Sequence, residues 1–254
     1  ELAAQGVVVE AERGSSAAPA SSKCFFRMVC IPSVWAVFMG QICFNYNRYL
    51  MYNWIVTYYT DGLQIPVAEA GACMLWPNVM DAVFSFGVGV VADGLARSGK
   101  MSRLAVRRLF STLGFLGTGV GVLMLVWAEG RVVVTVIVTV ASAMQACHNA
   151  GFKSSYGDLS VRYAGVLRGT GNMLGTGSSF VVPLLAAAFL DAGGGSSVRA
   201  AWGAVFQSAL ACGIIGALSF FALAATESID DRLCDPGAAG VASDASAGEV
   251  KKDL

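Results

Sequence analysis

Six long apolar segments constrain the fold of this 254-residue chain more than any other feature. A helix needs ~20 predominantly apolar residues to cross the hydrocarbon core of a bilayer. The segments of this kind are residues 31–59, 67–92, 107–128, 132–151, 163–190 and 200–225. None of them shows the alternating pattern of a membrane β-barrel strand. The chain is also 56% hydrophobic and only 13% charged, whereas soluble domains are about 25% charged. We therefore predict an all-α integral membrane protein with six transmembrane helices.

Charge and cysteine content argue against several function classes. The 17 basic and 17 acidic residues balance, so bulk electrostatics do not favour a nucleic-acid partner. The seven cysteines are scattered without a CxxC pair, which indicates small buried side chains and no metal site. His148 is the only histidine, which leaves little room for acid–base chemistry. We expect a protein that is not an enzyme, in which His148 is packed and hydrogen-bonded.

Basic residues fall mainly on one side of the predicted bundle. Five lie between the second and third segments or at the start of the third: Arg97, Lys100, Arg103, Arg107 and Arg108. Three lie between the fourth and fifth segments or at the start of the fifth: Lys153, Arg162 and Arg168. The opposite side has Arg131 and Arg199. Because loops rich in Lys and Arg stay on the cytoplasmic side, we expect both tails to be cytoplasmic, or stromal in a plastid.

The two ends differ in composition from the middle of the chain. We expect a disordered cytoplasmic segment at 1–28, a six-helix bundle at 29–226 and a disordered cytoplasmic tail at 227–254, because the ends are rich in Ala, Gly, Ser and charge. The chain begins at Glu1 without a signal-peptide pattern, and we expect that an upstream part is missing.

A polar stripe runs along the first apolar segment. Gln41, Asn45, Arg48 and Tyr52 recur at helical spacing, and Tyr49 flanks them. An arginine at the depth of the hydrocarbon core costs roughly 2.5–3.5 kcal/mol on insertion scales, so Arg48 should face something other than lipid. In a water-filled cavity its planar guanidinium can bind an anion through two hydrogen bonds.

Asp81, near the middle of the second segment, leaves two interpretations of Arg48 open. Either Arg48 contacts substrate, directly or under the control of Asp81, or the two charges form a purely structural ion pair. The candidate substrate-binding residues are Asn45, Arg48, Tyr49, Tyr52 and Asp81.

Two stretches of sequence resemble one transporter family. Residues 89–100, GVVADGLARSGK, resemble the signature loop of the major facilitator superfamily, with Asp93 and Arg97 one helical turn apart. Residues 157–175, GDLSVRYAGVLRGTGNMLG, resemble the stretch joining helices 10 and 11 in the anion:cation symporter family of that superfamily. The matching positions are Asp158, Arg162, Tyr163, Ala164, Gly165, Val166, Leu167, Gly169 and Asn172. The chain thus resembles the C-terminal six-helix half of such a transporter, most closely the plant plastid phosphate and ascorbate branch.

This resemblance implies a secondary active transporter of small anions, either inorganic phosphate or an organic anion, driven by an ion gradient or by the membrane potential. Substrate would bind near the midplane between this half and a missing N-terminal six-helix half, and rocking of the halves would give alternating access. No cofactor is implied beyond a coupling Na⁺ or H⁺. The family uses plastid, endolysosomal and plasma membranes. Two alternatives stay open: a non-transporting half that serves as a scaffold or partner subunit, and a transporter of a non-anionic solute.

The same motifs suggest roles on the cytoplasmic side. Pairs one helical turn apart can bond neighbouring helix ends and latch that side when the transporter faces outward. The expected latch residues are Asp93, Arg97, Asp158 and Arg162. Small residues let helices approach closely. We expect helix packing at Gly89, Gly165, Gly169, Asn172, Gly175 and Gly177.

Overall fold

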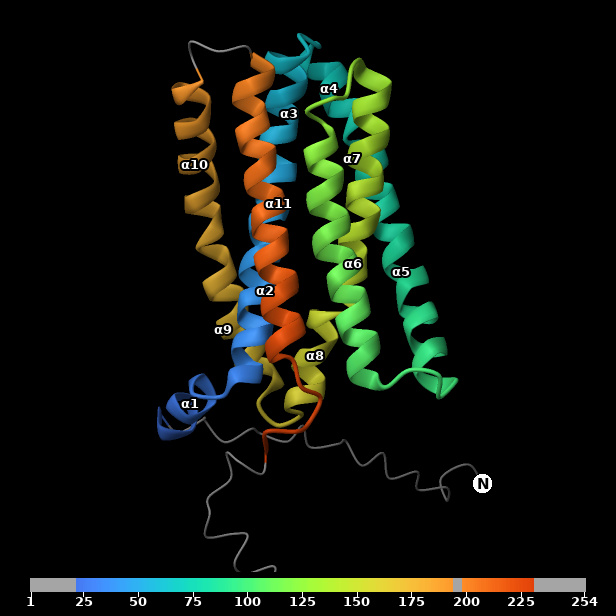
Figure 1. Cartoon of the computed structure of the whole chain (residues 1–254), viewed down its shortest axis with the longest axis vertical. Coiled ribbons are helices and arrows are strands. Elements are labelled where there is room, and N and C mark those ends of the chain that lie inside the picture. The colour runs from blue at the N-terminus through green and yellow to red at the C-terminus, as the bar shows by residue number, and fades with distance from the viewer. Residues whose placement is uncertain (1–21, 194–197, 231–254) are drawn as a thin grey trace, which may run out of the picture.

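The computed structural model describes residues 22–193 and 198–230, and all regular elements in these ranges are helical. They are α1 (Ser22–Val29), α2 (Pro32–Tyr49), η1 (Leu50–Trp54), α3 (Ile55–Thr57), η2 (Tyr58–Gly62), α4 (Val67–Cys73), α5 (Leu75–Arg97), α6 (Arg103–Met124), α7 (Arg131–Ala146), η3 (Cys147–Asn149), α8 (Phe152–Leu159), α9 (Ala164–Thr176), α10 (Ser178–Ala192) and α11 (Val198–Leu223). After α1, consecutive elements join into six rods: α2 to η2, α4–α5, α6, α7 to α8, α9–α10 and α11. Figure 1 shows the rods side by side along one axis.

Local sequence explains where several rods begin. Pro32 lies in the first turn of α2, where its missing N–H leaves no helical bond unmade. Gly99 and Gly130 adopt positive φ angles of 68° and 78°, which turn the chain before α6 and α7. Ser102 caps α6, because its hydroxyl accepts a hydrogen bond from the Ala105 N–H at 3.2 Å.

Four of the rods are long and apolar enough to cross a membrane: Val67–Arg97, Arg131–Leu159, Ala164–Ala192 and Ala201–Leu223. The α2 rod is less apolar because it carries the polar stripe, and α6 because it begins with arginines and contains several glycines. Both pack against α11, so they share its depth in the bundle. The all-α membrane fold predicted from the sequence is confirmed.

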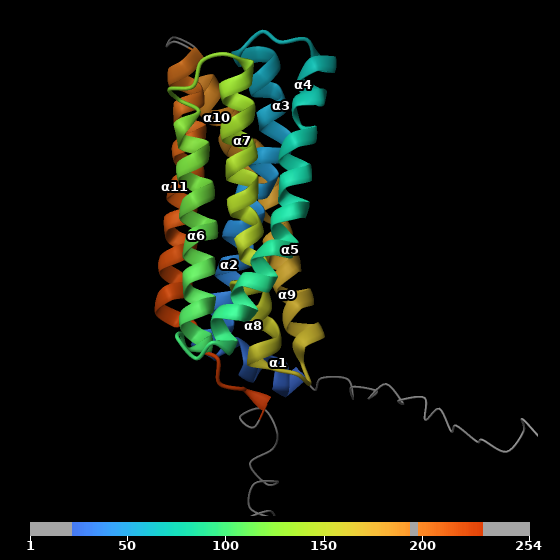
Figure 2. The ribbon, with the colours of Figure 1, turned by 90° about the vertical axis from the view of Figure 1, so that its right-hand side faces the viewer.

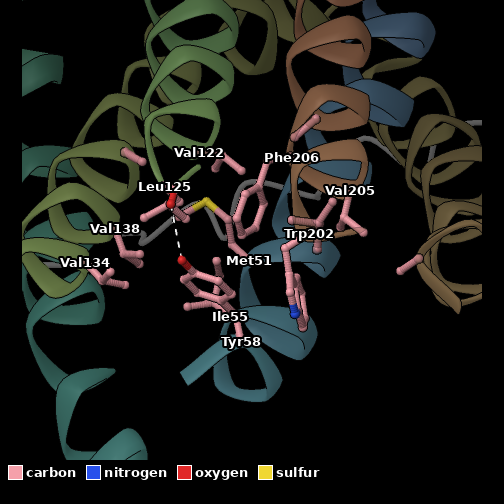
Figure 3. Close-up of a cluster of buried hydrophobic side chains, with 14 of the residues drawn as sticks. Met51, Ile55, Tyr58, Val122, Leu125, Val134, Val138, Trp202, Val205 and Phe206 are labelled. Carbon is pink, nitrogen blue, oxygen red and sulfur yellow. Dashed lines mark hydrogen bonds between the residues drawn. The ribbon is translucent and has the colours of Figure 1, made fainter. Parts of the chain in front are cut away.

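Two large apolar cores fill the bundle at different heights, and a smaller one around Phe110 lies between α5, α6 and η3. One surrounds Phe115, Phe152 and Tyr156, toward the end where α1 lies. The other joins the α2 rod, α6, α7 and α11 at the opposite end, and Figure 3 shows it. There the rings of Tyr58, Trp202 and Phe206 pack together, and the Tyr58 hydroxyl donates to the Leu125 carbonyl at 3.2 Å.

The predicted boundaries of the disordered ends were wrong where single apolar residues anchor the chain. Residues 22–29 form the helix α1, and Met28 is buried in the core around Phe115. Near the other end Ile229 is buried in the same core, and its N–H donates to the Leu159 carbonyl at 2.8 Å. The remainder of both predicted tails, 1–21 and 231–254, lies outside the described residues.

The basic loops gather at one end of the molecule. The α5–α6 connection, the α8–α9 connection, α1 and the end of the described chain all lie at the bottom of Figure 1. Arg131 lies at the opposite end, at the start of α7.

Candidate functional site

A large polar cavity opens on one side of the bundle. Its volume is about 1210 Å³, and its lining residues come from α2, η1, α5, α7, η3, α8 and α9. The rods α6 and α11 contribute no lining residue, and Figure 2 shows them on the side away from α5 and α9. The charged lining residues are Arg48, Asp81, Lys153 and Arg168. Neutral polar groups on the wall include Gln41, Asn45, Tyr49, Tyr52, Asn53, Gln145, Asn149, Ser154, Tyr156 and Asn172.

Arg48 lies at the centre of a network that joins three rods. Its Nη1 lies 3.5 Å from Asp81 Oδ2 on α5 and donates to Gln145 Oε1 on α7 at 3.4 Å. Its Nη2 donates to the Tyr52 hydroxyl at 3.3 Å, and that hydroxyl donates to Asn78 Oδ1 at 2.8 Å. The guanidinium is therefore held in position while 36% of the side chain stays exposed to the cavity.

The other predicted substrate-binding residues lie on the same wall. Asn45 is buried to 7% exposure, and its Oδ1 accepts a hydrogen bond from Gln41 Nε2 at 3.1 Å. Tyr49 and Tyr52 both line the cavity, and the Tyr52 ring lies 4.8 Å from the Arg48 guanidinium carbon. The structure thus brings together all five candidates and pairs Arg48 with Asp81, and both interpretations of Arg48 stay open.

Two cations of the cavity, Lys153 and Arg168, were not among the predicted site residues. Lys153 Nζ donates to Asn149 Oδ1 at 3.1 Å and lies 3.9 Å from the centre of the Phe44 ring. Arg168 Nη2 donates to the Lys153 carbonyl at 3.4 Å. The sequence interpretation counted both as loop cations. One sequence pattern could have indicated that Arg168 faces a cavity. Four small or polar residues fall on one face of a helix at the spacing of Gly165, Arg168, Gly169 and Asn172.

Asp158 connects α8 to α6 at the basic end. Its carboxylate accepts from Arg107 Nε at 2.7 Å and lies 3.8 Å from Arg103 Nη1. Arg107 also donates to the Ala150 carbonyl at 2.8 Å, so one guanidinium ties the start of α6 to the residues just before α8 and to the last turn of α8. The backbone N–H of Arg162 faces the Asp230 carboxylate at 3.5 Å.

The other predicted latch pair does not join through its side chains. Arg97 Nε donates to the backbone carbonyl of Asp93 at 3.3 Å, and the Asp93 carboxylate forms no ion pair with any residue the structure describes. Both side chains are exposed at the end of α5, where water solvates each charge and a surface pair gains little.

Four of the predicted packing positions are wrong for contacts within this chain. A Cβ built at Gly89, Gly165 or Gly169 would meet no atom within 4 Å, and Asn172 is exposed. Gly89 is partly buried on α5, and the other three line the cavity, where the two glycines leave open space. A Cβ at Gly177 would meet only a carbonyl of the preceding turn.

Gly175 does pack closely. A Cβ there would lie 2.7 Å from Asn45 Nδ2 and 3.1 Å from the Gln41 carbonyl, so α9 approaches α2 at this residue.

His148 packs in the core beside the cavity. It is 1% exposed, and its ring centre lies 4.2 Å from that of Phe115 and 5.3 Å from those of Phe44 and Phe152. Its Nδ1 has no hydrogen-bond partner, so the expected packing is confirmed and the expected hydrogen bond at that atom is not. Across residues 22–193 and 198–230, no three His, Cys, Asp or Glu side chains cluster closely enough to hold a metal ion.

Sequence comparison finds plant transporters as relatives of this chain. The ascorbate transporter of the Arabidopsis thaliana chloroplast is 30% identical over 201 residues, which cover 79% of this chain and 36% of that protein. Probable anion transporter 4 of the Oryza sativa subsp. japonica chloroplast is 29% identical over 73% of this chain and 30% of its own length. Sodium-dependent phosphate transport protein 1 of the A. thaliana chloroplast is 28% identical over 57% of this chain and 28% of its own length.

The chain thus spans about a third of the length of these curated relatives. No family model matches it. The aligned part nevertheless takes in most of the six rods, and the all-helical membrane bundle agrees with the resemblance found in the sequence. The homologues of this chain are therefore plant chloroplast anion and phosphate transporters of the anion:cation symporter group of the major facilitator superfamily, the family that its motifs resemble.

Proposed function

We propose that this chain is the C-terminal half of a secondary active transporter that carries small anions through the cavity by alternating access. The observation that carries the proposal is the charge of the cavity wall. Three cations, Arg48, Lys153 and Arg168, face the cavity against one carboxylate, Asp81. Cations at membrane depth are expensive unless water or an anion compensates them, and intramembrane charges commonly mark a substrate pathway.

Exposed apolar surface on both sides of the cavity supports a missing partner half. Trp76 and Phe86 on α5 are 57% and 81% exposed, and Phe180 and Leu184 on α10 are 73% and 71% exposed. The α4–α5 and α9–α10 rods both contribute apolar surface beside the polar wall, and they form opposite edges of the bundle in Figure 1. A second six-helix half placed over the cavity would cover these edges and enclose the substrate at the midplane.

The cytoplasmic latch is part of the proposal. Asp158 is already held by Arg107, whereas Asp93 and Arg97 are exposed and available to bond a helix end of the other half. Replacing Asp93 with Asn should slow turnover more than it weakens substrate binding. Equal loss of rate and affinity, in a variant with a normal thermal unfolding profile, would argue against a latch.

We also propose that anion transport is coupled to Na⁺ or H⁺, and that the protein lies in a plastid membrane with both tails on the stromal side. One relative is named a sodium-dependent phosphate transport protein, and all three relatives described above are named as chloroplastic. Substituting choline for Na⁺, or collapsing the proton gradient, in the uptake assay identifies the coupling ion.

Uptake by the polypeptide encoded by the full-length transcript, reconstituted in liposomes, tests the function. Radiolabelled phosphate, ascorbate, glutamate and sialic acid are offered in turn, and we expect saturable uptake of at least one. Arg48→Ala should abolish it. Lys100→Gln is the matched control, because Lys100 is an exposed cation on the α5–α6 loop outside the cavity. If the wild-type protein takes up none of the four, anion transport fails and the scaffold or non-anionic solute alternatives stand.

A further inference from the structure

We propose that the cavity selects anions with two negative charges over singly charged anions of the same size, and that Lys153 and Arg168 hold the second charge. This inference rests on the proposed anion transport and adds the substrate class. Counting Arg48, Lys153 and Arg168 against Asp81 leaves the wall with an excess of two positive charges. A dianion neutralises that excess, whereas a monoanion leaves one cation uncompensated.

The charges form two groups that come from different helices. Arg48 on α2 is already partly neutralised by Asp81, which lies 3.5 Å away on α5. Lys153 on α8 and Arg168 on α9 form the other group, because Arg168 Nη2 donates to the backbone carbonyl of Lys153 at 3.4 Å. An anion with two charged ends, or one compact doubly charged anion, can engage both groups.

Lys153 and Arg168 form no ion pair with a carboxylate in the part of the chain that the structure describes. Of the three N–H donors that the Lys153 ammonium carries, one is given to Asn149 Oδ1. Its remaining charge is supported by the face of the Phe44 ring at 3.9 Å. An aromatic ring stabilises a cation much less than an oxyanion does, so the site stays ready to accept one.

The Phe44 ring connects the two groups. It contacts Lys153 at 3.9 Å, and the Arg48 guanidinium carbon lies 5.7 Å from the same ring centre. Two like charges that share one apolar ring repel each other, and an anion between them removes that repulsion. A ligand that brings two negative charges gains more from these two cations than a singly charged one, which is the physical basis of the selectivity.

Matched pairs of competitors test the charge dependence directly. Uptake of radiolabelled phosphate by the full-length transporter in liposomes is competed with sulfate or methanesulfonate, which share a tetrahedral shape and differ by one charge. Succinate and its monoamide, succinamate, form a second pair. We expect inhibition constants at least tenfold lower for each dianion at neutral pH, which corresponds to 1.4 kcal/mol. Equal inhibition within each pair would overturn the inference.

Variants assign the second charge to its residues. Lys153→Gln and Arg168→Gln should each reduce the preference for sulfate over methanesulfonate at least fivefold, and Lys153→Arg should retain it. Lys100→Gln should leave the preference unchanged, because Lys100 lies outside the cavity. An unchanged preference in both Gln variants would refute the assignment. If a variant fails to fold, the wild-type competitor pairs still decide the selectivity.

The outcomes separate this inference from the proposed function. No uptake of phosphate or of the other three tracers removes the transporter proposal itself. Uptake that is competed equally by monoanions and dianions leaves anion transport standing and removes only the selectivity for doubly charged substrates.

Discussion

Replacing Asp81 with Asn should strengthen substrate binding, because Asp81 competes with the substrate for Arg48. The change removes one negative charge and keeps the size and hydrogen-bonding ability of the side chain. At the observed separation of 3.5 Å, the Coulomb attraction is about 1 kcal/mol with the dielectric constant of water and about 5 kcal/mol with an effective value of 20. Since the side chains are 36% and 24% exposed, solvent screening favours the lower part of that range.

We therefore expect the affinity for a tracer anion to rise about tenfold, equivalent to about 1.4 kcal/mol. The measurement is the concentration of unlabelled anion that half-inhibits uptake into liposomes. Asp191→Asn is the control, because Asp191 is an exposed carboxylate at the end of α10 outside the cavity. Unchanged or weaker binding by a correctly folded Asp81→Asn protein would refute the competition between Asp81 and the substrate.

The double change Arg48→Leu plus Asp81→Leu separates substrate binding from a structural ion pair. A buried pair replaced by apolar residues is often neutral or stabilising, so a structural role predicts a folded protein that still transports. We expect a folded protein that has lost transport, since the anion loses its guanidinium. Arg48→Lys should lower affinity about tenfold, because lysine keeps the charge and loses the planar fork of donors. Retained transport in the double variant would end the substrate role of Arg48.

Two further predictions concern stability in detergent, each followed by thermal unfolding. Arg107→Gln should destabilise the protein by about 1–3 kcal/mol, because it removes the 2.7 Å partner of the largely buried Asp158. Arg103→Gln should change stability by only about 0–1 kcal/mol, since the Arg103 side chain is 69% exposed and its Nη1 lies 3.8 Å from Asp158. Equal effects of the two would contradict this difference in burial. Gly175→Ala should destabilise the protein by about 1–3 kcal/mol, because the new Cβ would lie 2.7 Å from a side chain of α2. Gly89→Ala should not destabilise it, because a Cβ there would meet no atom within 4 Å. A tolerant Gly175 would mean that α9 can move away from α2.

The sequence predicts the rods of this fold well because length and apolarity decide whether a helix can span a bilayer. The six segments correspond to the six rods, and the stripe around Arg48 lines a cavity because an arginine is too costly to leave in lipid. The ends were harder to predict. Met28 and Ile229 each anchor a segment whose average composition is that of a tail, and composition averages over such single residues.

Lys153 and Arg168 are two of the four charged residues of the cavity wall, and the sequence analysis did not predict them as site residues. The α7 rod tightens at Cys147–Asn149 and continues past Gly151 as α8, so Lys153 lies within a rod instead of in a loop. Gly151 permits this continuation, because a Cβ there would lie 2.7 Å from the Ser111 nitrogen on α6. That contact between distant parts of the chain has no local signature in sequence.

The sequence pattern predicts close helix packing at Gly165, Gly169 and Gly175 of α9, but glycine has two structural roles in this helix. On α9 the same residue type marks a close contact with α2 at Gly175 and open space at Gly165 and Gly169. Both arise from the absence of a side chain, so the spacing alone does not distinguish packing from a cavity wall.

The π-helical turn η1 begins at Leu50, two residues after Arg48, and changes the helical register of the α2 rod. A π-helical turn holds one residue more than an α-helical turn, and one residue corresponds to a rotation of about 100°. The cavity-lining residues of the rod end within η1, at Tyr52 and Asn53, and after η1 the rod contributes Ile55 and Tyr58 to the apolar core. A relative that lacks this turn should align with the chain only through a one-residue gap at Leu50–Trp54. Deleting one residue after Asn53 would keep Arg48 and Tyr52 on the cavity side while it rotated Tyr58 away from the Leu125 carbonyl, so this helix can change its cavity face and its packing face independently in evolution.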